Sequence, residues 1–94
     1  MEVNIITVEY LEKLIEQAMS IYHIDIKDST SKHTNHNTYS GGMHLRALIV
    51  SDDFDNKSLI ERHRLIYNLL GKYIRKEIHA ISIKALTKNE YIKK

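Results

Sequence analysis

The sequence predicts a single α+β domain, in which helices pack on a small mixed β-sheet, from three observations. First, a chain of 94 residues, 43% hydrophobic and 28% charged, is typical of one folded domain with one modest core. Second, segments with apolar residues every three or four positions are interspersed with short apolar segments typical of strands. Third, the interval between the last two expected strands is far too long for a hairpin, which favours a parallel pair. We therefore expect one domain over residues 1–94.

The N-terminal half predicts one helix and two strands. Residues 8–22 carry apolar side chains at three- and four-residue spacing, and Thr7 can cap the helix that this spacing predicts. Residues 24–28 alternate apolar and polar, as in a half-buried strand. Residues 43–51 predict a second strand, and we expect it to pair antiparallel with the first. Between them, residues 29–42 (STSKHTNHNTYSGG) lack any apolar pattern, and so long a loop in a small domain is usually functional.

The C-terminal half predicts a helix, a short helical turn, a strand and a terminal helix. Ser58 and Glu61 form an S-x-x-E capping box that opens the helix, and Gly71 ends or bends it. Residues 72–76 predict the helical turn, residues 78–83 the third strand, and residues 87–92 a second capping box with its helical turn. The expected order is helix, strand, strand, helix, helix, strand, helix, with the helices on one face of the sheet.

Within the helix after Ser58, the 3.6-residue period predicts which side chains are buried. Arg62 is expected to point away from the core, together with Glu61, Arg64 and Asn68. The expected apolar face consists of Leu59, His63, Ile66, Tyr67 and Leu70.

Several classes of function lack their defining residues. The chain has no cysteine, which excludes a disulfide scaffold, a thiol nucleophile and a cysteine zinc knuckle. The hydrolase G-x-S-x-G, the P-loop and the dinucleotide-binding G-x-G-x-x-G are also missing. The acidic residues 52–55 are better explained by loop capping than by a metal site. We expect no enzyme. Without a membrane-length apolar run or a targeting pattern at the N-terminus, we expect a cytoplasmic protein.

The six histidines are the most informative residues for function. His79 opens the third expected strand and would face the long loop, which carries His33 and His36. Two imidazoles of this kind can form half of a metal site, and the remaining ligands must then come from another molecule. His63 is more typical of a core or interface residue, and His23 of a cation at the end of the first helix.

The charge distribution raises nucleic acid as an alternative partner. Residues 1–56 carry four Lys/Arg against nine Asp/Glu, whereas residues 57–94 carry ten against three. The basic half suits either a phosphate backbone or an acidic protein surface. A KH-type reader needs a G-x-x-G loop, which is missing here. The helix after Ser58 and the helical turn at residues 72–76 would form a helix–turn–helix-like pair. The phosphate contacts expected on it are Arg62, Arg64, Lys72, Arg75 and Lys76.

Several linked motifs resemble the BolA family, and the resemblance spans essentially the whole chain from Val8. Ser51 and Phe54 match a serine followed three residues later by phenylalanine, RHRLIY at residues 62–67 matches the family's helix motif, and IHAI at residues 78–81 matches its strand motif. Thr87 and Glu90 match a terminal T-x-x-E. His44, with its preceding glycines, is similar to the family's G-x-x-H-F segment, although the next residue is leucine.

The chain departs from the family pattern at two points. Asn56 replaces a glycine two residues after Phe54, and asparagine tolerates a positive φ better than most residues, so we expect the turn to persist. The long loop also exceeds that of close relatives. The family's spacing of serine and histidine fits Ser31 and His33 best, with His36 as the alternative loop ligand.

The resemblance implies a fold similar to class II KH domains and a non-enzymatic iron–sulfur adaptor. Its implied partner is a monothiol glutaredoxin, in a heterodimer that shares a 2Fe-2S cluster with glutathione. By correspondence, His79 and His33 would be the ligands that this chain supplies. The family has also been regarded as DNA-binding transcriptional regulators, which is the alternative function.

Overall fold

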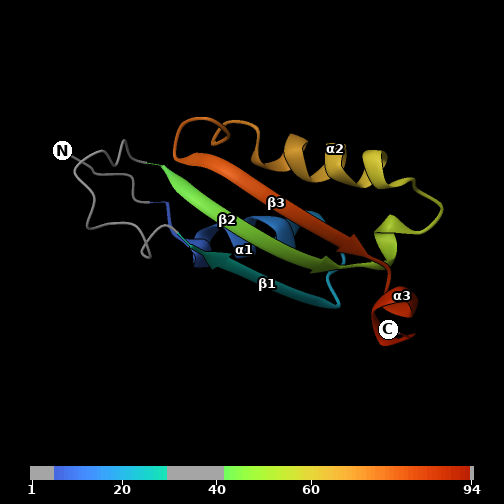
Figure 1. Ribbon diagram of the computed structural model, residues 1–94. Helices are drawn as coiled ribbons and strands as arrows, with labels where there is room; N and C mark the ends of the chain where they lie inside the picture. Colours follow the sequence, from blue (N-terminus) through green and yellow to red (C-terminus); the bar gives the residue numbers. More distant parts are fainter. Residues whose placement is uncertain (1–5, 30–41, 94) are drawn as a thin grey trace.

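The computed structural model describes residues 6–29 and 42–93 and has the predicted α+β architecture (Figure 1). Its three strands form one sheet in the order β1-β2-β3, with β1 and β2 antiparallel and β2 and β3 parallel, as the sequence predicts. None of the helices seen there has the length and apolarity needed to cross a membrane. The elements are α1 (Val8–Ala18), β1 (His23–Asp28), β2 (Met43–Val50), the 3-10 helix η2 (Asp52–Phe54), α2 (Leu59–Leu70), β3 (Ile78–Leu86) and α3 (Lys88–Lys93).

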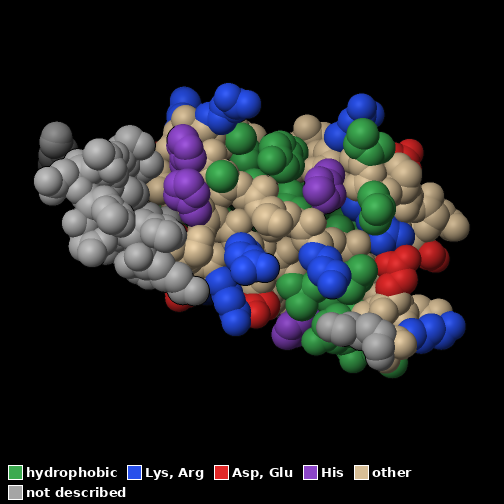
Figure 2. Space-filling model, in the orientation of Figure 1, with side chains coloured by type: hydrophobic (Ala, Val, Ile, Leu, Met, Phe, Trp, Pro, Cys, Tyr) green, Lys and Arg blue, Asp and Glu red, His purple; other side chains and the backbone are tan. Residues whose placement is uncertain are grey.

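The two long helices lie on one face of the sheet, and no described helix covers the opposite face. The register places Ile26, Ala47 and Ile83 side by side across the three strands. Ile26 and Ala47 belong to the buried core, and the partly buried Ile83 packs against it. Figure 1 shows α1 behind the sheet and α2 beside β3, so the core lies between these helices and the sheet. The uncovered face is turned toward the viewer in Figure 2, where lysine and arginine side chains are prominent over the strands.

The first helix is shorter than the sequence predicts, because the residues after it form hydrogen bonds outside the helix. Thr7 caps α1 as expected, but the helix ends at Ala18 rather than at residue 22. The backbone N–H of Ser20 donates to Asp53 and its carbonyl accepts from the Ser51 hydroxyl at 2.6 Å. These bonds hold Ser20 beside the end of β2, so the chain does not continue as a helix. His23 is therefore not at a helix end, and begins β1.

The helical turn expected over residues 72–76 is also not formed. Tight turns connect α2 to β3, and the backbone N–H of Arg75 donates to the Ile78 carbonyl at 2.6 Å. Arg75 has a φ of 67°, in the left-handed region that no α-helix contains. Between β2 and β3 the structure therefore has one α-helix, α2, and the short η2, where the sequence predicts a helix followed by a second helical turn.

The turn after β2 shows why an asparagine is accepted where the resemblance leads one to expect glycine. Asn56 has a φ of 63°, which asparagine adopts at less cost than most residues. Phe54 is fully buried, and the Ser51 hydroxyl accepts from the Asp53 backbone N–H at 3.0 Å. The carboxylates of Asp52 and Asp53 accept backbone N–H bonds from residues 88 and 20. The expectation that this acidic run caps loops is confirmed.

The ion pair between α2 and α3 makes the stability of the domain dependent on pH. Hydrogen bonds from Arg62, and then from the Thr87 backbone, lower the pKa of Glu90 from 4.5 to about 2. The ionised carboxylate thus stabilises the fold above about pH 4.5, and this contribution is lost as the pH falls toward 2. We expect Glu90→Gln to flatten the loss of stability in that window, measured by urea unfolding at several pH values. An unchanged acid limb would contradict this assignment.

Candidate functional site

His44 and His79 meet at the end of the sheet where the two parallel strands begin. His44 is the second residue of β2 and His79 the second residue of β3, and both are exposed. The centroids of their rings are 4.9 Å apart, with an angle of 36° between the ring planes. Figure 2 shows two adjacent histidine side chains at this end of the sheet. We call these two residues the histidine pair.

A β-bulge in β3 brings the histidine pair together. Met43 is opposite Ile78 and His44 is opposite Ala80, so His79 is an extra residue with no partner on β2. Ile78 and Ile81 both contact the core, although they are three positions apart. In a regular strand this spacing would turn one of them outward, and the bulge instead leaves His79 and Ala80 on the surface. The bulge therefore aims an imidazole at the start of the neighbouring strand.

Gly42 allows the backbone at His79 to approach β2. Its φ of +89° lies in the region that suits glycine, and a Cβ there would be only 2.9 Å from the Cβ of His79. The adjacent Met43 N–H donates to the Glu77 carbonyl at 2.7 Å, which holds the two strand starts together. The position of the His79 ring thus depends on a residue at the start of β2.

Substitution of Gly42 by alanine should therefore disturb His79. We expect Gly42→Ala to lower the free energy of unfolding by about 1–2 kcal/mol, the typical cost of a left-handed backbone in a residue with a Cβ. The His79 ring resonances in an NMR spectrum should also shift. Gly71→Ala is the matched control, because Gly71 has a φ of −54° and lies far along the chain. Equal effects of the two substitutions would contradict this account of Gly42.

The long loop predicted to carry a ligand begins and ends at the histidine pair. His33 and His36 lie outside the described residues. On one side of that segment, the Ser29 N–H and hydroxyl both contact the carbonyl of His44, at 2.9 and 3.0 Å. On the other side, Gly42 adjoins His79. The described residues on either side of this segment, Ser29 and Gly42, thus both lie beside the histidine pair.

The other two described histidines, His63 and His23, contact groups of the same chain. The His63 Nε2 lies 3.1 Å from the carbonyl of Ile83, on the outer edge of β3. The His23 ring stacks on Tyr91 at 5.4 Å and 18°. His63 is exposed rather than on the buried face that the sequence predicts.

The histidine pair has the chemistry of a partial metal site. An imidazole nitrogen binds iron, zinc or copper, and two adjacent rings can supply two ligands to one ion. Over residues 6–29 and 42–93, no cluster of three or more His, Cys, Asp or Glu side chains is placed to hold a metal ion. Any metal bound by the described residues therefore needs further ligands from the loop or from another molecule.

The structure removes Arg62 from the proposed phosphate contacts. Arg62 is only 6% exposed, whereas the sequence predicts that it points away from the core. Its guanidinium donates to the carbonyls of Lys57 and Ala85 at 3.0 and 2.9 Å and to both carboxylate oxygens of Glu90. It also lies over the Phe54 ring. These bonds connect α2 to β3 and α3. Because the donors of Arg62 are used within the protein, this side chain cannot bind DNA.

The remaining basic candidates lie on the surface. Arg64 is exposed on α2, and Lys72, Arg75 and Lys76 are exposed in the turns before β3. They lie on two different segments and do not form the helix–turn–helix-like pair that the sequence predicts, because residues 72–76 are not helical.

The sequence analysis did not name His44 as a ligand, although two signals point to it. The first signal is that His44 lies at the start of β2, as His79 does at the start of β3, so two parallel strands in register place these residues side by side. The apolar spacing of three in IHAI, where a strand requires two, is the signal for the bulge that completes the pair.

The family model for BolA-like proteins matches residues 15–90 of this chain. An uncharacterized protein of Buchnera aphidicola is 39% identical over 85 residues, which is 90% of this chain and 80% of that protein. The DNA-binding transcriptional regulator BolA of Haemophilus influenzae is 28% identical over 83 residues, 88% of this chain and 79% of that protein. Among solved structures, the BolA domain of SufE1 from Arabidopsis thaliana is similar with a TM-score of 0.75 and 34% identity, over 87% of this chain and 92% of that one.

Proposed function

The chain belongs to the BolA-like protein family, and from this premise we propose that it is a non-enzymatic iron–sulfur adaptor. In this proposal it binds a monothiol glutaredoxin as a heterodimer. It then co-ligates a bridging 2Fe-2S cluster, for cluster trafficking or iron regulation. The cluster is a shared cargo, with the thiolate ligands supplied by the glutaredoxin and by glutathione.

The observation that carries the proposal is the exposed histidine pair. Two imidazoles with ring centroids 4.9 Å apart, at the end of a sheet, are accessible to a cluster held by another protein. Because the chain has no cysteine, histidine is the only nitrogen or sulfur ligand of the usual kind that it can offer to iron, apart from methionine. Histidine ligation in place of thiolate raises the potential of a 2Fe-2S cluster, as in Rieske centres.

The donor set fits half of such a cluster. One iron would be bound by sulfur from the partner side, and the other by two ligands from this chain. We propose His79 as the first of these, with His44, His33 or His36 as the second. His44 is the one whose position beside His79 is described, and the two loop histidines belong to the segment whose ends are held there.

The proposal is tested by mixing the full chain with a cluster-loaded monothiol glutaredoxin. We expect a 1:1 heterodimer on size-exclusion chromatography and a change in the visible absorption and circular dichroism of the cluster. Addition of the apo-glutaredoxin with glutathione but no iron is the control, and it should leave the visible region blank. A cluster spectrum identical to that of the glutaredoxin alone, at any ratio of the two proteins, would contradict the proposal.

DNA binding is the second candidate function, because the similar protein of Haemophilus influenzae is named a DNA-binding transcriptional regulator. The exposed residues Arg64, Lys72, Arg75 and Lys76 would then contact phosphates. Affinity for duplex DNA in a mobility-shift assay should fall steeply with salt, and Lys72→Ala with Lys76→Ala should weaken binding equally for all sequences. Negligible binding at low salt would remove this candidate.

A further inference from the structure

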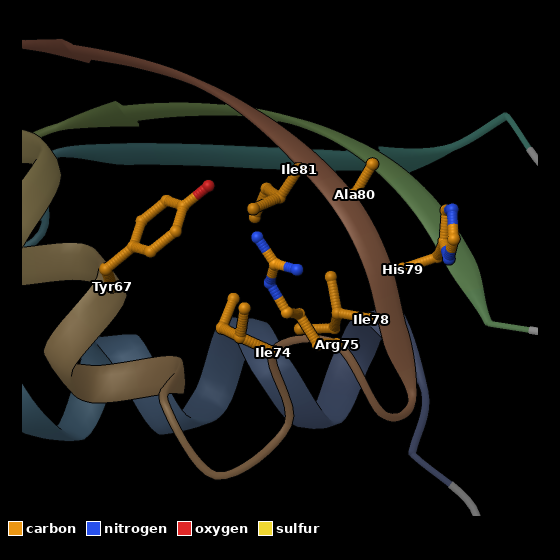
Figure 3. A pocket seen from close by; sticks show the side chains of 7 residues that line it. All are labelled: Tyr67, Ile74, Arg75, Ile78, His79, Ala80 and Ile81. Carbon is orange, nitrogen blue, oxygen red and sulfur yellow. The ribbon is translucent and has the colours of Figure 1, made fainter.

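A pocket of about 610 Å³ lies on the other side of β3 from the histidine pair. It is bounded by the C-terminal part of α2, by the turns after Gly71 and by the start of β3 (Figure 3). Aliphatic side chains in its wall come from Ile74, Ile78, Ala80 and Ile81. The backbone of His79 borders it, while the His79 ring points away from it. The pocket and the histidine pair therefore share one strand but do not compete for the same side chain.

Two polar groups enter this pocket from opposite sides. Figure 3 shows the hydroxyl of Tyr67, from α2, and the guanidinium of Arg75, from the turn, directed toward each other and toward Ile81. Within residues 6–29 and 42–93, neither group forms a hydrogen bond or an ion pair with another side chain. A guanidinium and a phenol hydroxyl that converge in one pocket present donors for one anionic group.

The backbone at Arg75 indicates that its side chain has a role of its own. Its φ of 67° costs a residue with a Cβ about 1–2 kcal/mol, whereas glycine adopts this conformation freely. The turn is held by the bond from the Arg75 N–H to the Ile78 carbonyl and by a bond from the Ile78 N–H to the Tyr73 carbonyl. A strained position that directs a charged side chain into a pocket is typical of a binding site.

The same pocket borders the part of the β3 edge that α2 leaves open. The outward carbonyls of Ala85 and Ile83 are contacted by Arg62 and His63 of α2. Backbone groups alternate between the two edges of a strand, so the N–H and C=O of Ile81 face the same edge as the carbonyls of Ile83 and Ala85. At Ile81 this edge borders the pocket. An exposed strand edge pairs readily with an extended peptide.

We propose that this pocket binds a carboxylate side chain on an extended segment of the protein that docks at the histidine pair. The proposal rests on the proposed function for the identity of that partner. A single guanidinium flanked by aliphatic side chains suits a monoanionic carboxylate on a peptide with apolar neighbouring residues. A DNA backbone would instead need several cations along its path. Pairing with Ile81 would set the register that brings the carboxylate to Arg75.

The test uses two capped pentapeptides, identical except that the central residue between flanking valines is glutamate in one and glutamine in the other. Each is titrated into the ¹⁵N-labelled full chain and followed by NMR. We expect the glutamate peptide to shift the amides of Tyr67, Arg75 and Ile81 saturably, and the glutamine peptide to bind at least tenfold more weakly. Equal binding of the two peptides overturns the proposal, as does a DNA oligonucleotide that shifts these amides when the glutamate peptide does not.

Two variants make the test specific to the pocket. Arg75→Gly should weaken binding of the glutamate peptide at least tenfold, with a melting temperature equal to or above that of the wild type, because glycine relieves the positive φ. Tyr67→Phe should weaken it less and keep the ring. Arg64→Ala removes one exposed charge of α2 outside the pocket and should change nothing. Unchanged affinity in Arg75→Gly overturns the proposal.

These experiments distinguish failure of the pocket proposal from failure of the proposed adaptor function. The peptide titration contains no iron and no glutaredoxin, so it reports on the pocket alone. If the glutaredoxin fails to bind and the peptide binds as expected, the proposed function is wrong and the pocket assignment holds. If the cluster spectrum forms with the wild type and with Arg75→Gly at equal affinity, the adaptor function holds and the pocket proposal is wrong.

Discussion

Replacement of His79 by alanine is expected to abolish the change in the cluster spectrum when the chain meets a cluster-loaded glutaredoxin. Loss of a group that merely supports a metal ligand typically costs about 10- to 100-fold in affinity, so loss of the ligand itself should cost roughly a hundredfold or more. The fold should persist, because His79 is exposed and lies at a bulge. Far-UV circular dichroism and the visible spectrum measure the two effects side by side.

A series of histidine variants identifies the second ligand. If His44 is that ligand, His44→Ala should resemble His79→Ala, and His33→Ala and His36→Ala should leave the spectrum unchanged. The converse pattern would assign the ligand to the loop. His63→Ala is the matched control, since His63 is exposed and lies on the far edge of β3. Wild-type spectra and cluster stability in His79→Ala would show that this assignment is wrong.

Arg62→Ala is expected to have the largest effect on stability, a loss of about 2–4 kcal/mol in the free energy of unfolding. The substitution leaves the carbonyls of Lys57 and Ala85 without their donor and ends the link to Glu90. It also opens space above the buried Phe54 ring. Urea unfolding of the two proteins at neutral pH measures the difference.

Arg64→Ala provides the comparison for Arg62, because the same charge is removed two positions away on the same helix. Arg64 is exposed, so we expect its removal to change stability by no more than about 0.5 kcal/mol. If Arg62→Ala were as stable as Arg64→Ala and only DNA binding were weakened, Arg62 would be a phosphate contact after all.

Capping motifs and strand patterns were sufficient to predict most of the fold. The boxes at Ser58 and Thr87 both form as expected, with hydrogen bonds in both directions. They are local, so the residues that make them are adjacent in sequence. The end of α1 and the turns at residues 72–76 depend instead on distant partners. The Ser51 hydroxyl, which draws Ser20 out of the helix, is 31 positions away.

Burial of Arg62 shows a limit of hydrophobic periodicity. The pattern assigns charged residues to the surface, but a guanidinium can be buried when every donor direction finds an acceptor. Those acceptors come from residues 57, 85 and 90, which only the tertiary structure brings together. Leu59, which the pattern places on the buried face, is 72% exposed, whereas Arg62 is 6% exposed.

The candidate site was predictable for His79 and less so for its neighbour. His79 is distinguished in the sequence by its place at a strand start within a family motif. The proximity of His44 depends on a one-residue bulge, and the register of a parallel pair across residues 51–77 is not encoded locally. Gly42 is the residue in the sequence that best reflects this geometry, since its positive φ and lack of a Cβ are both needed beside His79.

Direct detection of nitrogen bound to iron tests the central claim. The chain is labelled with ¹⁵N-histidine and combined with unlabelled glutaredoxin, glutathione and cluster, and the reduced complex is examined by electron–nuclear double resonance. The account predicts strongly coupled ¹⁵N from this chain in the wild type, and its reduction or loss in His79→Ala. A reduced cluster that forms in the complex with no strongly coupled ¹⁵N would contradict histidine ligation by this protein.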